Sequence, residues 1–355
     1  MTTKSEQLFQ KQDRIKPTQN DKLQADIQAR LNSLTKPPDS LGRLEQLAIK
    51  MGLIQRSVIP EVDKKIHLIF ASDHGINEEG VSAYPSEVTR QMVLNMLGGG
   101  AAISVFCKMS QTPCKVYDIG VIGELPDHPD LLQKKVREGT ANFMQTAAMT
   151  PEEMYSAMEA GYNAVAEDFP DYQLYSLGEM GIANTTPSAA VICATEKFSV
   201  EAVCGKGTGL NDQQLSNKVE VIRSAIKKHS PDSTSPYEIL RTVGGLEIAA
   251  LVGAILAGAE RNKVMVLDGV ITGAAFVLAE MMQPAVGDYC IFGHRSADRL
   301  GNGIVEHTGE IPLLDLGMRL GEGTGAVLST HLLQAACNMM SQMATFQSAN
   351  VSGKS

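Results

Sequence analysis

Short β-prone runs that alternate with helical stretches are the feature that most restricts how this chain can fold. Six such runs occur after residue 60, each closed by glycine or a polar residue: residues 66–75, 115–120, 172–181, 200–209, 263–269 and 288–296. Helical stretches lie between them, among them residues 85–97, 151–169 and 244–260. Because strands separated by helices usually pair in parallel, the alternation predicts an α/β fold with three layers, α/β/α.

Polar residues follow all six β-prone runs. They are Asp73-His74, Asp118, Glu179, Lys206, Asp268 and His294-Arg295. In open parallel sheets, ligands bind outside the carboxyl ends of the strands, near the point where the strand order reverses. We therefore expect the functional site at this edge of the sheet, whereas the pattern leaves the reaction open.

Both ends of the chain have helical patterns. Residues 1–59 are polar and amphipathic, with a proline-rich turn at 36–39, and residues 323–343 form a methionine-rich apolar run. We expect residues 60–325 to form the catalytic α/β domain. Residues 1–59 together with 326–355 are expected to form a small helical subdomain built from the chain ends.

Charge and spacing argue against several protein classes. The formal charge of −9 disfavours a broad nucleic-acid or anionic-membrane surface. The chain has no uncharged apolar stretch of about 18 residues, as a membrane span needs, and its N-terminus lacks the apolar core of a signal peptide. The cysteines form no CxxC pair and the histidines no HxxxH pair, which disfavours zinc. We expect a cytoplasmic protein without metal or other cofactor.

A glycine-rich motif ends the fourth β-prone run. It consists of Gly205, Lys206, Gly207, Thr208 and Gly209. Closely spaced glycines allow backbone N–H groups to face an anion, while the lysine adds charge and the threonine a hydroxyl donor. The motif is not a Walker A sequence, so it gives little support to an NTPase. The alternative is a tight turn with no ligand.

A second motif places an acid between glycines. Gly321 and Gly323 flank Glu322, so its carboxylate has little side-chain cover of its own in the sequence. Enclosure by a ligand or a neighbouring segment would raise the pKa of Glu322 and suit it as a general base. The alternative is that Glu322 caps the following helix and that Arg319 forms a surface ion pair with it.

The third motif spans residues 178–187. Asn184, Thr185 and Thr186 can cap a helix that begins near Pro187. The same helix N-terminus, with Gly181 before it, is suited to an anion or a ribose. Glu179 would then face the same pocket as Glu322, whereas plain capping remains the alternative.

The segment from residue 73 to 92 carries a weaker signal. No serine or cysteine stands beside His74 in the sequence, so this histidine is interpreted as a positioning hydrogen-bonding group rather than a catalytic base. Tyr84 and Met92 can line an apolar slot, although residues of these types at such spacing more often belong to the core.

Together these segments closely resemble the nicotinate-nucleotide:dimethylbenzimidazole phosphoribosyltransferases of cobalamin lower-ligand synthesis. The matching stretches, in the family's order, are residues 35–48, 71–103, 178–190, 205–212, 244–259, 267–275, 293–298 and 312–326. They span almost the whole chain, and the last stretch is close to diagnostic.

The resemblance implies a homodimer whose subunit has a Rossmann-like large domain and a small helical domain. It implies transfer of 5-phosphoribose from nicotinate mononucleotide to 5,6-dimethylbenzimidazole, which gives α-ribazole 5′-phosphate and nicotinate in the assembly of the cobalamin nucleotide loop. Glu322 takes the position of the catalytic base, and Glu179 matches a second acid.

The resemblance also implies where the substrates bind. The nucleotide would contact Gly181, Asn184, Thr185, Thr186, Gly205, Lys206, Gly207, Thr208, Gly209, Arg319, Gly321 and Gly323. The aromatic base would contact Tyr84, Met92, Met180 and Leu320.

Two positions depart from the family pattern. Ala183 stands where the family usually has glycine, and Lys206 stands where it usually has arginine. Lysine keeps the charge but lacks the planar fork of arginine.

Two alternatives to this function remain open. One is the same reaction on benzimidazole, adenine or a phenol, and the other is a non-catalytic nucleotide-binding regulator.

Overall fold

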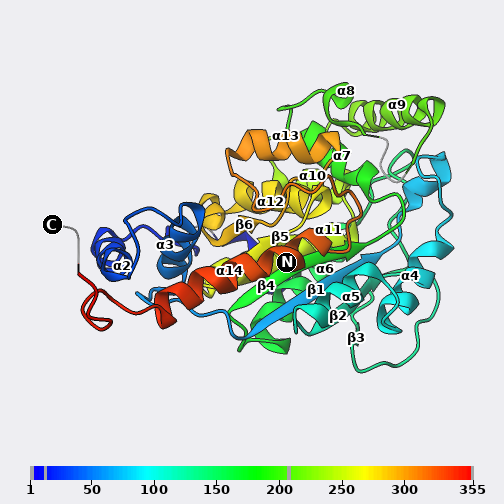
Figure 1. The fold of residues 1–355 in the computed structure, drawn as a ribbon. Coiled ribbons are helices and arrows are strands. Elements are labelled where there is room, and N and C mark those ends of the chain that lie inside the picture. The colour runs from blue at the N-terminus through cyan, green and yellow to red at the C-terminus, as the bar shows by residue number, and fades with distance from the viewer. Residues whose placement is uncertain (1–3, 12–13, 206–208, 353–355) are drawn as a thin grey trace.

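The computed structural model describes residues 4–11, 14–205 and 209–352, and its centre is a six-stranded parallel sheet (Figure 1). The strands are β1 (Lys65–Ser72), β2 (Cys114–Gly120), β3 (Leu131–Gln133), β4 (Leu174–Met180), β5 (Val264–Leu267) and β6 (Cys290–Phe292). Their order is β3-β2-β1-β4-β5-β6, and every neighbouring pair is parallel. The order reverses between β1 and β4, as in a Rossmann-like sheet. The predicted fold class is confirmed.

Helices cover both faces of the sheet. Ile66, Leu68 and Phe70 of β1 belong to the larger apolar core, while Ile69 and Ala71 point to the other face and join a second core. Helices α6 (Pro151–Asn163), α11 (Leu246–Glu260) and α12 (Val270–Met282) lie on the first face. Helices α4 (Glu87–Leu97), α5 (Ala102–Met109) and α14 (Thr324–Gln342) lie on the second. The three layers follow from this alternation.

The two chain ends meet beside the sheet. Helices α2 (Asp21–Ser33) and α3 (Arg43–Gln55) lie next to α14 at one end of the molecule (Figure 1). The guanidinium of Arg30 donates to the backbone carbonyls of Met340 and Met343. These contacts tie the N-terminal helices to the end of α14, while the division of the chain into two domains stays a prediction.

The remaining helical elements connect the layers. They are α1 (Lys4–Gln10), η1 (Gly75–Glu79), η2 (Ala164–Asp168), α7 (Thr185–Ala194), α8 (Val200–Val203), α9 (Asp212–His229), α10 (Pro236–Val243), η3 (Pro284–Tyr289) and α13 (Arg299–Thr308). Helices α7, α8, α9 and α13 lie on the α12 side of the sheet, near its carboxyl edge (Figure 1).

The strand predicted at residues 200–209 is wrong. The described part of this run begins with the short helix α8, whose N-cap Ser199 accepts a hydrogen bond from the backbone N–H of Ala202. Alternating apolar and polar residues in Val-Glu-Ala-Val imitate a strand, but the N-cap favours a helical turn. Conversely, β3 was not predicted, because three residues are too few to form a pattern.

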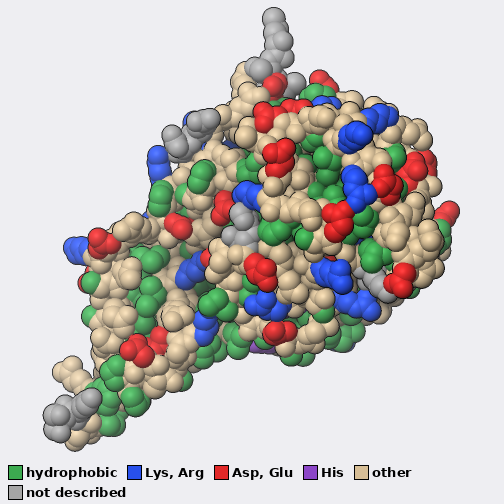
Figure 2. Space-filling view, turned by 90° about the horizontal axis from the view of Figure 1, so that it is seen from above, with side chains coloured by type: hydrophobic (Ala, Val, Ile, Leu, Met, Phe, Trp, Pro, Cys, Tyr) green, Lys and Arg blue, Asp and Glu red, His purple; other side chains and the backbone are tan. Residues whose placement is uncertain are grey.

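One helical segment, Glu87–Met109, is long and apolar enough by composition to cross a membrane, with a mean hydropathy of 1.4. In the fold this segment consists of two helices, α4 and α5, separated by a turn at residues 98–101. Both pack on the second core through residues such as Val93 and Ile103. Basic and acidic side chains are interspersed over the face seen in Figure 2.

Candidate active site

A cavity of about 750 Å³ lies at the carboxyl edge of the sheet. It brings together thirteen residues that the sequence had pointed to: Tyr84, Met92, Glu179, Met180, Gly181, Asn184, Thr185, Asp268, His294, Arg319, Leu320, Gly321 and Glu322. They come from α4 and the loop before it, the end of β4, the loops after β4, β5 and β6, the start of α7 and the loop before α14. The volume is in the range of small-molecule sites.

The cavity has further walls that sequence reasoning missed. They include Val88, Ala102, Phe106, Ile182, Val270, Ile271, Thr272, Ser296, Asp298 and Met318. Ser296 and Asp298 follow β6, so the rule about strand ends would have found them if applied a few residues further. Ala102 and Phe106 lie on α5, which only tertiary packing brings to the site.

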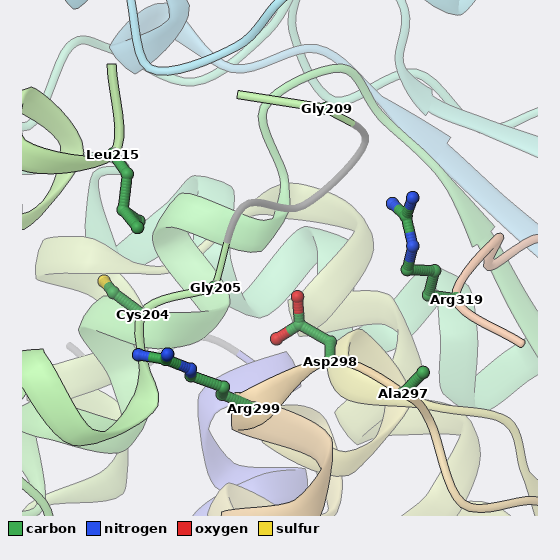
Figure 3. A pocket seen from close by; sticks show the side chains of 8 residues that line it. All are labelled: Cys204, Gly205, Gly209, Leu215, Ala297, Asp298, Arg299 and Arg319. Carbon is green, nitrogen blue, oxygen red and sulfur yellow. The ribbon is translucent and has the colours of Figure 1, made fainter. Parts of the chain in front are cut away.

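A smaller hollow of about 370 Å³ adjoins this cavity (Figure 3). It is lined by Cys204, Gly205, Gly209, Leu215, Ala297, Asp298, Arg299 and Arg319. Asp298 and Arg319 line both spaces, so the two lie next to each other. Lys206, Gly207 and Thr208 lie outside the described residues.

Glu322 lies in the loop before α14 and is 5% exposed. Its carboxylate accepts a hydrogen bond of 3.3 Å from the backbone N–H of Ile103, the second residue of α5. Burial raises the pKa of Glu322, the nearby Asp268 raises it further, and the Ile103 N–H opposes the shift. A buried carboxylate with a raised pKa beside an open cavity is suited to accept a proton.

Glu179 is the penultimate residue of β4 and is buried in the cavity wall. It accepts a hydrogen bond from the side-chain amide of Asn184, and both this amide and the backbone N–H of Glu322 act to lower its pKa. Burial raises the pKa of Glu179 to about 8, with contributions from Asp268 and Glu247. At neutral pH this carboxyl group is mostly protonated, so it adds little negative charge next to Glu322.

The predicted cap of the helix after β4 differs in detail. Helix α7 begins at Thr185 instead of near Pro187, and the side chain of Asn184 at the N-cap position makes no capping bond. It donates to Glu179 instead. Thr186 is buried and is not part of the cavity wall.

Lys218 is a buried cation beside the site that the sequence did not reveal. Its Nζ donates to Thr185 Oγ1 over 2.8 Å, and burial lowers the pKa of the ammonium group. Its position within the amphipathic α9 gave no sign of this contact, because the side chain reaches α7 only in the folded chain.

Asp268 and His294 line the cavity next to the N-terminus of α14. The Asp268 carboxylate accepts hydrogen bonds from the backbone N–H groups of Gly325 (2.7 Å) and Ala326 (3.1 Å), at the N-terminus of that helix. His294 Nε2 lies 3.4 Å from the same carboxylate. This arrangement fixes the first turn of α14, which starts two residues beyond Glu322.

The buried pair His74 and Glu247 supports the loop after β4. Their Nε2 and Oε1 atoms are 2.8 Å apart, and both side chains are fully buried. A Cβ atom at Gly181 would lie 2.4 Å from the carbonyl oxygen of Ser72 and 3.0 Å from His74 Nε2. Position 181 therefore requires glycine, because the loop backbone passes directly over the end of β1.

The other end of the cavity is apolar. Tyr84 and Leu320 are about half exposed at its mouth, while Met180 is buried deeper inside. Phe106 adds an aromatic ring to the same wall. A flat aromatic molecule with one polar edge fits such surroundings, because most of its surface loses contact with water.

Comparisons with known proteins agree with this geometry. A family model described as a phosphoribosyltransferase (DBI_PRT) matches residues 16–351. Two relatives are named nicotinate-nucleotide–dimethylbenzimidazole phosphoribosyltransferase. That from Chloroflexus aggregans is 45% identical over 92% of each chain, and that from Chlorobaculum tepidum is 42% identical over 100% of this chain and 99% of its own. A crystal structure of CobT from Thermus thermophilus, 44% identical, superimposes with a TM-score of 0.90 over 94% of this chain and 100% of that chain.

Proposed function

The chain belongs to the nicotinate-nucleotide–dimethylbenzimidazole phosphoribosyltransferase family, and from this premise we propose how its own residues perform the transfer. The substrates are nicotinate mononucleotide as donor and 5,6-dimethylbenzimidazole as acceptor. The products are α-ribazole 5′-phosphate and nicotinate, in the assembly of the lower ligand of cobalamin.

Glu322 is the general base. The new bond forms between ribose C1′ and a nitrogen of the benzimidazole, while the bond between C1′ and the nicotinate nitrogen breaks. That electron pair returns to the pyridinium nitrogen, so nicotinate leaves without needing a general acid. The acceptor must lose its N–H proton, which passes to the carboxylate of Glu322. Attack opposite the leaving group converts the β-nucleotide into the α-product.

The observation that carries this assignment is the buried carboxylate of Glu322 at the boundary of the apolar wall and the polar loops. Its raised pKa makes it a stronger base than an exposed glutamate. Glu179 is the second acid, and its proton keeps Glu322 from facing another full negative charge. A positive charge that develops on the ribose would be favoured by the Glu322 carboxylate.

The donor occupies the polar part of the site in this proposal. Gly181, Asn184 and Thr185 contact the ribose, and the 5′-phosphate enters the smaller hollow, where Arg299 and Arg319 bring positive charge. Lys206, from the glycine-rich motif, supplies a further cation. Guanidinium groups suit this task because their donors match phosphate oxygens in pairs.

A product assay tests the proposed function. Nicotinate mononucleotide is incubated with 5,6-dimethylbenzimidazole, benzimidazole, adenine and p-cresol in competition, and the products are read by mass spectrometry. A ribazole phosphate formed together with nicotinate supports donor, acceptor and reaction type. Binding of the mononucleotide without any product would favour a non-catalytic regulator.

The acceptor preference has an alternative with structural support. Tyr84, Met92 and Met180 make the acceptor wall bulky and adaptable, since methionine side chains adjust to different ring shapes. A phenol would use an oxygen nucleophile, deprotonated by the same Glu322. The competition assay ranks the acceptors directly.

We also propose a homodimer that works in the cytoplasm. Tyr84 and Leu320 are exposed at the cavity mouth, and four further large apolar side chains are exposed on the surface: Val105, Met109, Ile311 and Leu316. An exposed apolar surface of this kind is typical of a protein interface. Sedimentation analysis of the wild type and of L316E, at 62% exposure the most open of these residues, tests the proposal, because the charge should weaken the dimer.

A further inference from the structure

Glu322 is held by its backbone as well as by its side chain. The backbone carbonyl of Glu322 lies 2.9 Å from His67 Nε2, and this histidine is completely buried in β1. The residue adopts a left-handed conformation with φ of +63°, which a non-glycine residue adopts only at a cost. The contact with His67 is therefore one of the interactions that keep the loop in this shape.

The tautomer of His67 follows from its partners. A carbonyl oxygen can only accept, so Nε2 must carry a proton to bond with Glu322. The other ring nitrogen, Nδ1, lies 2.9 Å from the hydroxyl of Ser176, its neighbour across the β1–β4 pair. Burial lowers the pKa of His67 to about 4, so the ring is neutral at pH 7. Nδ1 is then bare and accepts the proton of the serine hydroxyl.

Glycines bring the loop into close contact with this ring. A Cβ at Gly323 would lie 2.0 Å from His67 Cε1, and a Cβ at Gly178 would lie 2.3 Å from the carbonyl oxygen of Glu322. The loop backbone thus packs directly on the ring and on β4. If the ring shifts, the backbone of Glu322 must shift with it, because no flexible side chain lies between them.

We propose that His67 is a positioning residue for the base: its Nε2–H fixes the carbonyl of Glu322, and the serine hydroxyl of Ser176 fixes the tautomer that can do so. This inference rests on the proposed role of Glu322. His67 is fully buried and acts through Glu322, whose carboxylate is held separately by the N–H of Ile103.

Two substitutions at one position separate the two contacts of the ring. The side-chain nitrogen of glutamine is as many bonds from Cα as histidine Nε2, so H67Q can still donate to Glu322. The amide of asparagine reaches only the place of Nδ1, so H67N can keep the contact with Ser176 but loses the one with Glu322. We expect kcat of H67N to fall about 10- to 100-fold, because small misplacement of a reacting group is costly.

The KM for nicotinate mononucleotide should change less than threefold in H67N, and H67Q should recover most of kcat. A purely structural role would lower the melting temperature of both variants together and would not separate kcat from KM. Folded H67N with kcat within threefold of the wild type, or H67Q as impaired as H67N, would overturn the proposal.

A second measurement has its decisive outcome in the wild-type protein. Nitrogen-15 spectra of the imidazole groups in the wild-type protein at pH 7 should show His67 as the Nε2–H tautomer, and S176A should weaken that preference. A wild-type Nδ1–H tautomer would refute the contact. Loss of activity in E322Q is the separate test of the proposed base, so the two ideas can fail independently.

Discussion

The backbone N–H of Glu322 faces the carboxyl group of Glu179 closely enough to lower the pKa of that group, against the larger effect of burial. The two acids therefore meet through a peptide group and a side chain, instead of through two carboxylates. Asn184 occupies the other side of the Glu179 carboxyl group with its amide. Because of these donors, Glu179 orients the loop that carries Glu322, and the Glu322 carboxylate is left to face the cavity.

Replacement of Glu322 by glutamine should abolish most of the turnover. Glutamine keeps the size of the side chain and can still accept the N–H of Ile103, but it cannot take a proton from the acceptor. We expect kcat to fall by about 10² to 10⁴, the usual contribution of a positioned general base. Steady-state kinetics with saturating substrates measure this, with the melting temperature as a check on folding. Turnover within tenfold of the wild type would refute the assignment.

The pH profile should report the raised pKa of Glu322. The base works only when it is ionised, so activity falls as the pH drops through its pKa. Since burial raises that pKa above the ordinary value of 4.5, the acid limb of kcat against pH should lie above pH 4.5. The titration of the acceptor itself is measured separately by its absorbance. An acid limb below pH 4.5 would contradict the predicted shift.

Glu179 should make the stability of the protein depend on pH. Its pKa is raised from 4.5 to about 8 in the folded state, so the native protein holds a proton there that the unfolded chain releases. This contribution to stability is complete below pH 4.5 and is lost as the pH rises to about 8, by at most about 1.4 kcal/mol per pH unit.

The E179Q variant tests this, because glutamine resembles the protonated acid and does not titrate. Urea unfolding at pH 5 and pH 8 should show E179Q gaining stability relative to the wild type at the higher pH. E220Q is the matched control: Glu220 is fully exposed and its pKa is lowered by Ser224 and Arg223, so it should give no such difference. Parallel curves for wild type and E179Q would mean that Glu179 is ionised in the folded protein.

Local sequence patterns predicted those elements of the fold that depend on a few neighbouring residues. Five of the six β-prone runs contain a strand, because short stretches with β-branched, aromatic or other apolar residues are bounded there by glycine or polar residues. The strand predicted at residues 200–209 was wrong, because a four-residue alternation of apolar and polar residues is also compatible with a helical turn when Ser199 provides the N-cap. Strand β3 pairs with β2 at only three residues, and its neighbours in the sequence do not mark it.

Sequence reasoning found the residues of the site that stand next to glycines or at strand ends, such as Glu322 and Glu179. It missed residues whose role comes from contacts between distant segments. His67 lies in the middle of β1 and touches Glu322, 255 positions away. Similarly, Ile103 and Phe106 reach the site because α5 packs across the sheet edge, which no local pattern encodes.

Lys206 should affect donor binding more than turnover. The lysine belongs to a glycine-rich motif that is proposed to bind the phosphate of the nucleotide, an interaction shared by ground state and transition state. K206A should therefore raise the KM for nicotinate mononucleotide and change kcat less. K227A, at an exposed position in the last turn of α9, is the control for loss of one positive charge. An unchanged KM in K206A would show that the motif does not bind the phosphate.

Ala183 should limit the stability of the loop between β4 and α7. Its φ is +75°, in the left-handed region where a Cβ is unfavourable and glycine is preferred. A183G should therefore stabilise the protein by about 1 kcal/mol, since relief of strain exceeds the extra entropy of the unfolded chain. A160G, inside helix α6, should instead destabilise by about 1 kcal/mol. Urea unfolding at pH 7 measures both, and a loss of stability in A183G would mean that the methyl group contributes packing that outweighs the strain.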